Sequence, residues 1–233
     1  MTSPFETPTE PRDTWAAVDE YFNAGLSGED EALAAARRAS AEAGLPDIAV
    51  SAAEGKLLHL LARGTGARRI LEVGTLGGYS TIWLARAITR PGRLIALELS
   101  PHHAEVATAN LDRAGVGDLA EVRVGPAADS LEALLAGGAE PFDFVFIDAD
   151  KPNNARYFDY AIRLSRPGAM IVVDNVVSGG RVLDSGSRRA AGVGALVDGI
   201  AARPDVDAVT VQTVGPRGYD GFLLAVTGGA GER

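Results

Sequence analysis

The sequence predicts an α/β fold built on a mostly parallel sheet with an antiparallel edge. From Arg68 onward, short apolar runs rich in β-branched and aromatic residues alternate with longer amphipathic segments. This alternation is typical of parallel strands joined by helices that cover both faces of the sheet. After the last amphipathic segment, two more apolar runs are joined only by the sequence GPRG, which leaves no room for a helix. The last two strands are therefore expected to form a hairpin.

The individual elements follow from these patterns. Helices are expected before the sheet over residues 13–26, 30–44 and 51–64, the last with Ser51 as its N-cap. Parallel strands are expected at 68–73, 93–99, 120–125, 142–148 and 169–174, and hairpin strands at 206–214 and 219–226. The helices between strands are expected at 79–89, 100–115, 127–137, 151–165 and 187–203.

Domain organisation is expected to be simple. Residues 1–12 are rich in Pro, Thr and Glu and have no apolar periodicity, so we expect a frayed tail. With no linker or change in composition, the remainder is expected to be one domain, 13–233, with a helical appendage at 13–66 and the sheet-bearing core at 67–228.

Composition excludes several classes of function. The chain of 233 residues has no cysteine, which excludes disulfides, thiolate nucleophiles and cysteine-based metal sites. Its formal net charge of -9 repels a phosphate backbone and argues against nucleic-acid binding. No stretch reaches the length of a membrane span, and the start lacks the pattern of a secretory signal. We therefore expect a cytoplasmic protein that acts on a small molecule.

A glycine loop follows the first predicted strand, in the motif LEVGTLGGYS. Gly74 permits a tight turn, and Gly77 and Gly78 are expected to let a ligand approach the backbone at a helix N-terminus. The spacing departs from the dinucleotide pattern G-x-G-x-x-G, because position 76 is a leucine. Glu72 would repel a diphosphate, so a ligand with an ammonium group suits this loop better.

Glu98 ends the second predicted strand, 24 residues after Gly74. An acid at this place can accept hydrogen bonds from the ribose hydroxyls of an adenosine. Taken singly, Glu72 is explained as well by an ion pair at a strand end, and Glu98 by a solvated acid. The two acids on either side of a glycine loop together favour a nucleoside cofactor.

Polar side chains also follow the fourth and fifth predicted strands. Asp148 and Lys151 come after one strand, and Asp174 and Asn175 after the next. Parallel strands present their carboxyl ends on one edge, so these oxygens are expected to converge on Mg²⁺, with Mn²⁺ or Ca²⁺ as alternatives. A metal and a neighbouring ammonium would lower the pKa of a phenol bound between them. The alternative for Asp174 and Asn175 is a polar turn without a ligand.

Four segments together resemble the cation-dependent O-methyltransferases that use S-adenosylmethionine, a family that includes catechol and caffeoyl-CoA methyltransferases. They are LEVGTLGGYSTIWLA, LIALELSP, FVFIDADKPN and IVVDNVV, and the resemblance runs from about residue 45 to 226. It implies a Rossmann-like, seven-stranded sheet with a terminal hairpin, and a homodimer. Asn154 departs from the family, which usually has a tyrosine there, and this leaves the acceptor open.

The resemblance also assigns roles to particular residues. It implies that Lys151 is the base, that the metal ligands are Asp148, Asp174 and Asn175, and that Asp150 either steadies Lys151 or faces the cofactor. It implies that the methionine end of the cofactor is held by Glu72, Gly74, Thr75 and Ser80, and the ribose by Glu98. The adenine would be lined by Leu99, Ala127 and Ala128. Val50 would cover the cofactor from the N-terminal side, and Asp148 and Asp150 would face it.

The predicted function is methyl transfer from S-adenosylmethionine to a hydroxyl of a small phenolic acceptor with vicinal hydroxyls, dependent on a divalent cation. Two alternatives stay open at this point. One is a nicotinamide-dependent Rossmann dehydrogenase, against which the glycine spacing and Glu72 speak. The other is a protein that binds the cofactor without catalysis, although Asp148, Lys151, Asp174 and Asn175 are all present.

Overall fold

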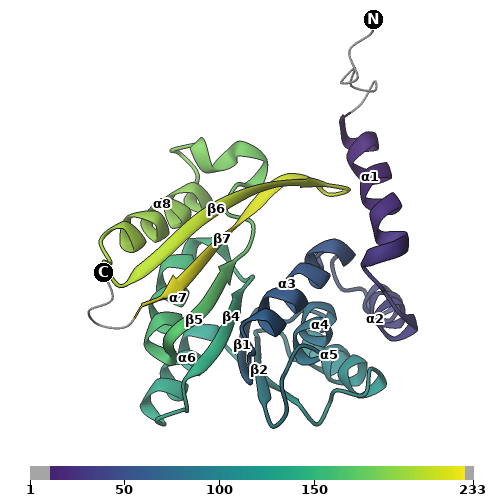
Figure 1. Cartoon of the computed structure of the whole chain (residues 1–233), viewed down its shortest axis with the longest axis horizontal. Helices are drawn as coiled ribbons and strands as arrows, with labels where there is room; N and C mark the ends of the chain where they lie inside the picture. Colours follow the sequence, from purple (N-terminus) through teal and green to yellow (C-terminus); the bar gives the residue numbers. More distant parts are fainter. Residues whose placement is uncertain (1–10, 229–233) are drawn as a thin grey trace, which may run out of the picture.

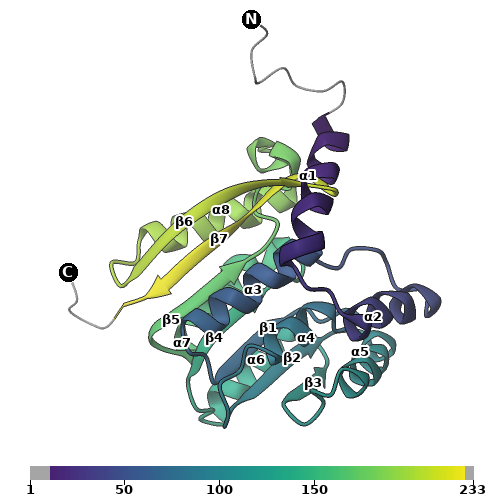
Figure 2. The ribbon, with the colours of Figure 1, turned by 45° about the vertical axis from the view of Figure 1, so that its right-hand side comes forward.

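A seven-stranded sheet organises the structure, a computed structural model of the chain that describes residues 11–228. The strand order is β3-β2-β1-β4-β5-β7-β6 (Figure 1, with β3 labelled in Figure 2). The predicted frayed tail, residues 1–12, lies outside the described residues except for Pro11 and Arg12, which begin the first helix. The sequence prediction of a Rossmann-like sheet is confirmed.

The strands begin and end close to the predicted residues. The first five pair in parallel, and β7 is antiparallel to both β5 and β6. β5 begins four residues earlier than expected, because Ser165 already pairs with Phe142 before an irregularity in the register. The strands are β1 Arg69–Val73, β2 Arg93–Glu98, β3 Ala120–Val124, β4 Phe142–Ile147, β5 Ser165–Val173, β6 Val206–Gly215 and β7 Gly218–Thr227.

The helices also follow the prediction, with local differences. The predicted helix 79–89 stops early, because the amide of Thr89 donates to the carbonyl of Ala67 instead of continuing the helical pattern. The predicted helix 151–165 is a 3₁₀ turn followed by a helix, and a second 3₁₀ turn was not predicted. The elements are α1 Pro11–Leu26, α2 Glu31–Glu42, α3 Ala52–Gly64, α4 Tyr79–Ala85, α5 Pro101–Arg113, α6 Ala127–Ala136, η1 Lys151–Asn153, α7 Asn154–Leu164, η2 Ser178–Leu183 and α8 Arg188–Ala201.

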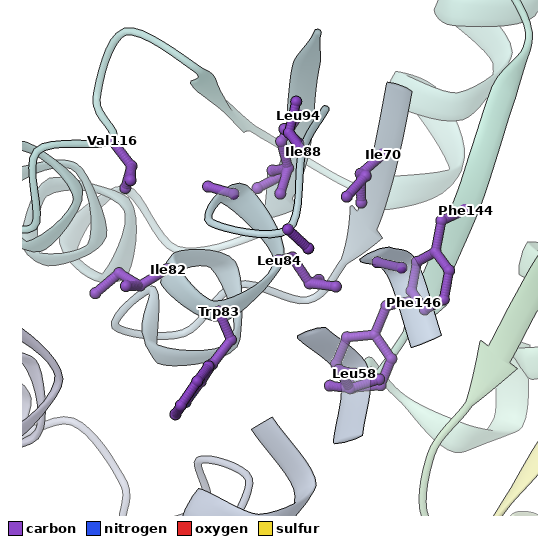
Figure 3. Packing of buried hydrophobic residues seen from close by; sticks show 14 of the residues in the cluster. Leu58, Ile70, Ile82, Trp83, Leu84, Ile88, Leu94, Val116, Phe144 and Phe146 are labelled. Atoms are coloured by element: carbon purple, nitrogen blue, oxygen red, sulfur yellow. The ribbon is translucent and has the colours of Figure 1, made fainter. Parts of the chain in front are cut away.

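Two apolar clusters hold the three layers together. Along β1, Ile70 packs with α3, α4 and α5 on one face, and Leu71 packs with α6, α7 and α8 on the other. Figure 3 shows the first cluster, in which Phe144 and Phe146 from β4 lie beside Leu58 of α3. Because alternate residues of a strand point to opposite faces, a strand buried on both sides reads as a continuous apolar run.

The N-terminal helices and the hairpin meet at one end of the molecule. The tip of the β6–β7 hairpin lies beside α1 (Figure 2), and Arg217 at this tip binds Asp47 at 2.9 Å. Asp47 belongs to the segment between α2 and α3, which therefore has a fixed position over the carboxyl ends of the strands. Within residues 11–228, none of the helices has the length and apolar character needed to cross a membrane.

Candidate functional site

A cavity of about 1130 Å³ lies at the carboxyl ends of the parallel strands. The loops after β1, β2, β4 and β5 line it, together with the segment between α2 and α3 and the start of α8. Its walls include nearly all of the predicted site residues. These are Val50, Gly74, Thr75, Ser80, Glu98, Leu99, Ala127, Ala128, Asp148, Asp150, Lys151 and Asn175.

The glycine loop is shaped mainly by close packing against the rest of the protein. Gly74 has φ 100°, and a Cβ there would lie 2.2 Å from the carbonyl oxygen of Asp148. At Gly77 a Cβ would lie 2.0 Å from the hydroxyl of Ser40 in α2, and at Gly78 it would lie 3.2 Å from Ala107 in α5. The packing of α2 and α5 thus requires glycine at positions 77 and 78, and Gly77 also lines the cavity, so the approach of a ligand to this backbone stays a prediction.

Glu98 fixes the conformation of this loop. Its side chain is almost fully buried, and one carboxylate oxygen accepts the backbone amides of Leu76 at 2.8 Å and Thr75 at 3.3 Å. The other oxygen accepts the amide of Ser100 at 2.9 Å. The alternative that Glu98 is a solvated acid is wrong. It lines the cavity while it holds the loop that would receive the cofactor.

Glu72 lies below the cavity wall rather than on it. The residue is fully buried and accepts hydrogen bonds from Ser80, at 2.6 Å, and Thr81. Burial raises the pKa of Glu72 to about 8, and the nearby carboxylates of Asp148 and Glu98 add to the rise. Glu72 thus meets the cavity through Ser80, and its direct contact with a cofactor stays a prediction.

Lys151 pairs with Asp148 on the cavity wall. Its ammonium lies 2.6 Å from an oxygen of Asp148, and only 5% of the residue is exposed. Asp150 binds elsewhere, accepting the hydroxyl of Tyr157 at 2.6 Å and the amide of Asn153. The suggestion that Asp150 steadies Lys151 is therefore wrong. Burial and the neighbouring Asp150 raise the pKa of the Tyr157 phenol above its ordinary range.

Asp174 follows β5 and is buried just below the cavity. Burial raises its pKa well above the ordinary value, and the carboxylates of Glu54 and Asp148 add to the rise. Glu54 shares a small interior cavity with Asp174. The sequence analysis missed Glu54, whose only signal was a capping box: its amide binds the Ser51 hydroxyl at 3.2 Å, and its carboxylate binds the Ser51 amide.

The donor chemistry of this region fits a divalent cation. Asp148, Asp174 and Asn175 bring carboxylate and amide oxygens, which hard cations such as Mg²⁺ prefer. The carboxylates of Glu54, Asp148 and Asp174 repel one another, and the positive charge of a bound cation would compensate this repulsion. Among the residues described, no three or more His, Cys, Asp or Glu side chains form a metal-binding group. The predicted metal ligands are two acids and one amide, which is fewer acids than such a group requires.

Sheet, glycine loop and cavity together define the Rossmann-like methyltransferase fold. The sequence profile of the O-methyltransferase family matches residues 24–225, most of the chain. The chain therefore belongs to the O-methyltransferase family, whose members take the methyl group from S-adenosylmethionine. This confirms the enzyme class predicted from the sequence and removes the dehydrogenase alternative.

Named relatives agree with this assignment. The catechol O-methyltransferase of Mycobacterium tuberculosis (strain ATCC 25618 / H37Rv) is 55% identical over 210 residues, covering 90% of this chain and 94% of that protein. The O-methyltransferase of Bacillus cereus, solved in complex with SAH, has a TM-score of 0.91 at 50% identity, covering 93% of this chain and 99% of that one. A Streptomyces achromogenes O-methyltransferase involved in tomaymycin synthesis, solved in complex with SAM, has a TM-score of 0.91 at 52% identity, covering 94% and 100%.

Proposed function

We propose that this enzyme transfers the methyl group of S-adenosylmethionine to one hydroxyl of a catechol-like acceptor and depends on a divalent cation, with Mg²⁺ preferred over Mn²⁺ and Ca²⁺. The observation that carries the proposal is the contact of 2.6 Å between Lys151 and Asp148 on the wall of the large cavity. The names of the catechol O-methyltransferase relatives support the acceptor class.

The residues of the chain divide the work between cofactor and acceptor. Glu98 and the glycine loop hold the nucleoside end, while Leu99, Ala127 and Ala128 offer apolar contacts to its base and Val50 closes the site from the other side. When bound, S-adenosylmethionine supplies an activated methyl group, and the cation supplies positive charge at the acceptor oxygens through Asp148, Asp174 and Asn175.

Lys151 supplies the proton transfer in this proposal. A phenol is mostly protonated at neutral pH, but its oxygen must carry negative charge to attack a methyl carbon. Once the ammonium of Lys151 has lost a proton to solvent, its neutral amine would accept the proton of the acceptor hydroxyl, and the resulting oxyanion would be placed to receive the activated methyl group that S-adenosylmethionine supplies, with the sulfur as leaving group. Only 5% of Lys151 is exposed, which limits the contact of this side chain with water, and its bond to Asp148 fixes its direction.

The cation requirement is tested by titration as well as by turnover. Chelated enzyme should lose methylation of a catechol and regain it with Mg²⁺ or Mn²⁺. Calorimetry should show Mn²⁺ binding to the parent protein, and Asp174→Asn should abolish that binding while its far-ultraviolet circular dichroism is kept. Asp198→Asn, at an exposed acid of α8 that does not line the cavity, is the matched control and should bind Mn²⁺ as the parent does. Full turnover after exhaustive chelation would contradict the metal requirement.

Two broader predictions belong to this proposal. A homodimer is supported by apolar side chains on the outer side of α1, where Tyr21, Phe22 and Leu26 are 76%, 52% and 69% exposed. Sedimentation analysis of the parent and of Phe22→Glu should show a dimer that the substitution weakens, and a monomeric parent would remove the idea.

A cytoplasmic location is supported by the absence of cysteine, and fractionation of cells tests it.

A further inference from the structure

Arg189 lies at the start of α8, on the helix face that touches Lys151. One turn later, Gly192 packs so closely that a Cβ would lie 2.5 Å from the carbonyl oxygen of Lys151. Residues three apart share a helix face, so Arg189 lies above the same contact. It lines the large cavity together with Lys151 and Asn175. Its guanidinium therefore belongs to the part of the cavity where the proposed function places the acceptor.

Hydrogen bonds hold this guanidinium in place. One amino group of Arg189 donates to the hydroxyl of Ser178 at 2.7 Å, and Ser178 in turn donates to the carbonyl of Asn175 at 2.8 Å. Ser178 is almost fully buried, and its own amide donates to Asp220 at 2.7 Å. A side chain anchored in this way loses little further freedom when it binds a ligand.

The charge of Arg189 has no acidic partner among residues 11–228. Arg37 and Arg38, which also line the cavity, pair with Glu29 and Glu31, while Arg156, which has no salt bridge either, is exposed and lies over the ring of Tyr160. In a chain with a formal net charge of -9, an arginine left without an acid inside the cavity is free to bind an anion from outside. Guanidinium groups bind carboxylates through two parallel hydrogen bonds.

We propose that the acceptor is a catecholic acid, whose ring carboxylate binds Arg189 while its hydroxyls face Lys151. This inference rests on the proposed function and names the substrate class within it. The carboxylate belongs on the same small ring, because Arg189 is joined through the hydroxyl of Ser178 to the backbone of Asn175, one of the proposed metal ligands. Arg189 contributes binding rather than proton transfer, so it selects the acceptor and orients it.

A matched pair of acceptors tests the inference. The enzyme, with S-adenosylmethionine and Mg²⁺, methylates 3,4-dihydroxybenzoate and its neutral amide in separate reactions, and the ratio of their kcat/KM values is the readout. A charge-assisted hydrogen bond contributes about 1.5–3 kcal/mol, so Arg189→Gln should lower the ratio of acid to amide by about 10–100-fold, mainly through KM for the acid. Arg189→Lys keeps the charge and should restore part of the ratio.

Arg188→Gln is the control, because Arg188 is the neighbouring residue on α8, is exposed and does not line the cavity. It should keep the parent ratio. An equal ratio in the parent and in Arg189→Gln overturns the inference, while methylation of the amide still supports the proposed function. If neither acceptor is methylated by the parent, both the proposed function and this inference fall. A thermal unfolding curve like that of the parent shows that each variant is folded.

Discussion

Gly192→Ala tests whether the contact between α8 and Lys151 sets the geometry of the site. The added Cβ would lie 2.5 Å from the Lys151 carbonyl oxygen and 2.7 Å from Cα of Pro152, both backbone atoms. Ordinary contact begins at 3.4 Å, so α8 and η1 must separate by about 0.9 Å, the difference between 3.4 and 2.5 Å. Overpacking of this kind costs about 1–3 kcal/mol, of which better helix propensity returns about 1 kcal/mol.

Stability and turnover should therefore change together. We expect a net loss of up to about 2 kcal/mol in the free energy of unfolding, read from urea denaturation. A displacement near 1 Å at Lys151 should also lower the rate of methyl transfer by about 100-fold, read in single-turnover reactions. Cofactor affinity should change little, because the cofactor residues of the glycine loop lie on other elements.

Gly194→Ala is the matched control on the same helix. A Cβ at Gly194 meets nothing within 4 Å, so this change should stabilise the protein by about 0.5–1 kcal/mol and leave turnover intact. A Gly192→Ala variant as stable and as fast as the parent would refute the close packing of α8 on η1, and with it the placement of Arg189.

Two further predictions concern the cofactor side. Glu98→Ala should weaken S-adenosylmethionine binding by about 1.5–3 kcal/mol, because it removes an acceptor of cofactor and loop donors, and calorimetry that gives an unchanged Kd would remove Glu98 from the site. The pKa of Glu72 is raised from 4.5 to about 8, so its share of stability is complete below about 4.5 and is lost as pH rises through about 8. Glu72→Gln should make the fall of unfolding free energy with pH shallower in that window, and an equally steep fall would contradict the raised pKa.

The fold was predictable because its strands are buried on both faces. Runs such as the one that contains Phe144 and Phe146 are continuous and apolar, and GPRG left only a hairpin between the last two strands. The end of α4 was not predictable in this way. It depends on the bond from Thr89 to Ala67, which joins residues 22 positions apart in the sequence, as 89 minus 67 gives.

The candidate site was predicted where strand ends carry polar residues, as at Asp148 and Asp174. Glu54 and Arg189 were missed because tertiary packing gives them their place. Glu54 reads locally as the third residue of a capping box, and only the packing of α3 brings it to Asp174. Arg189 is one arginine in a loop-helix junction, and only the glycine contact of α8 brings it to the cavity.

The role of Lys151 is tested most directly by single-turnover methylation in Lys151→Ala. On a simple catechol the rate should fall by about 10²–10⁴-fold, the range for loss of a positioned base, and the loss should shrink on a nitrocatechol, whose hydroxyl is already acidic. Lys56→Ala, at the chain's other lysine and outside the cavity, should match the parent on both acceptors. If Lys151→Ala instead methylates the simple catechol at the parent rate, Lys151 is only the salt-bridge partner of Asp148 and the proposed proton transfer is wrong.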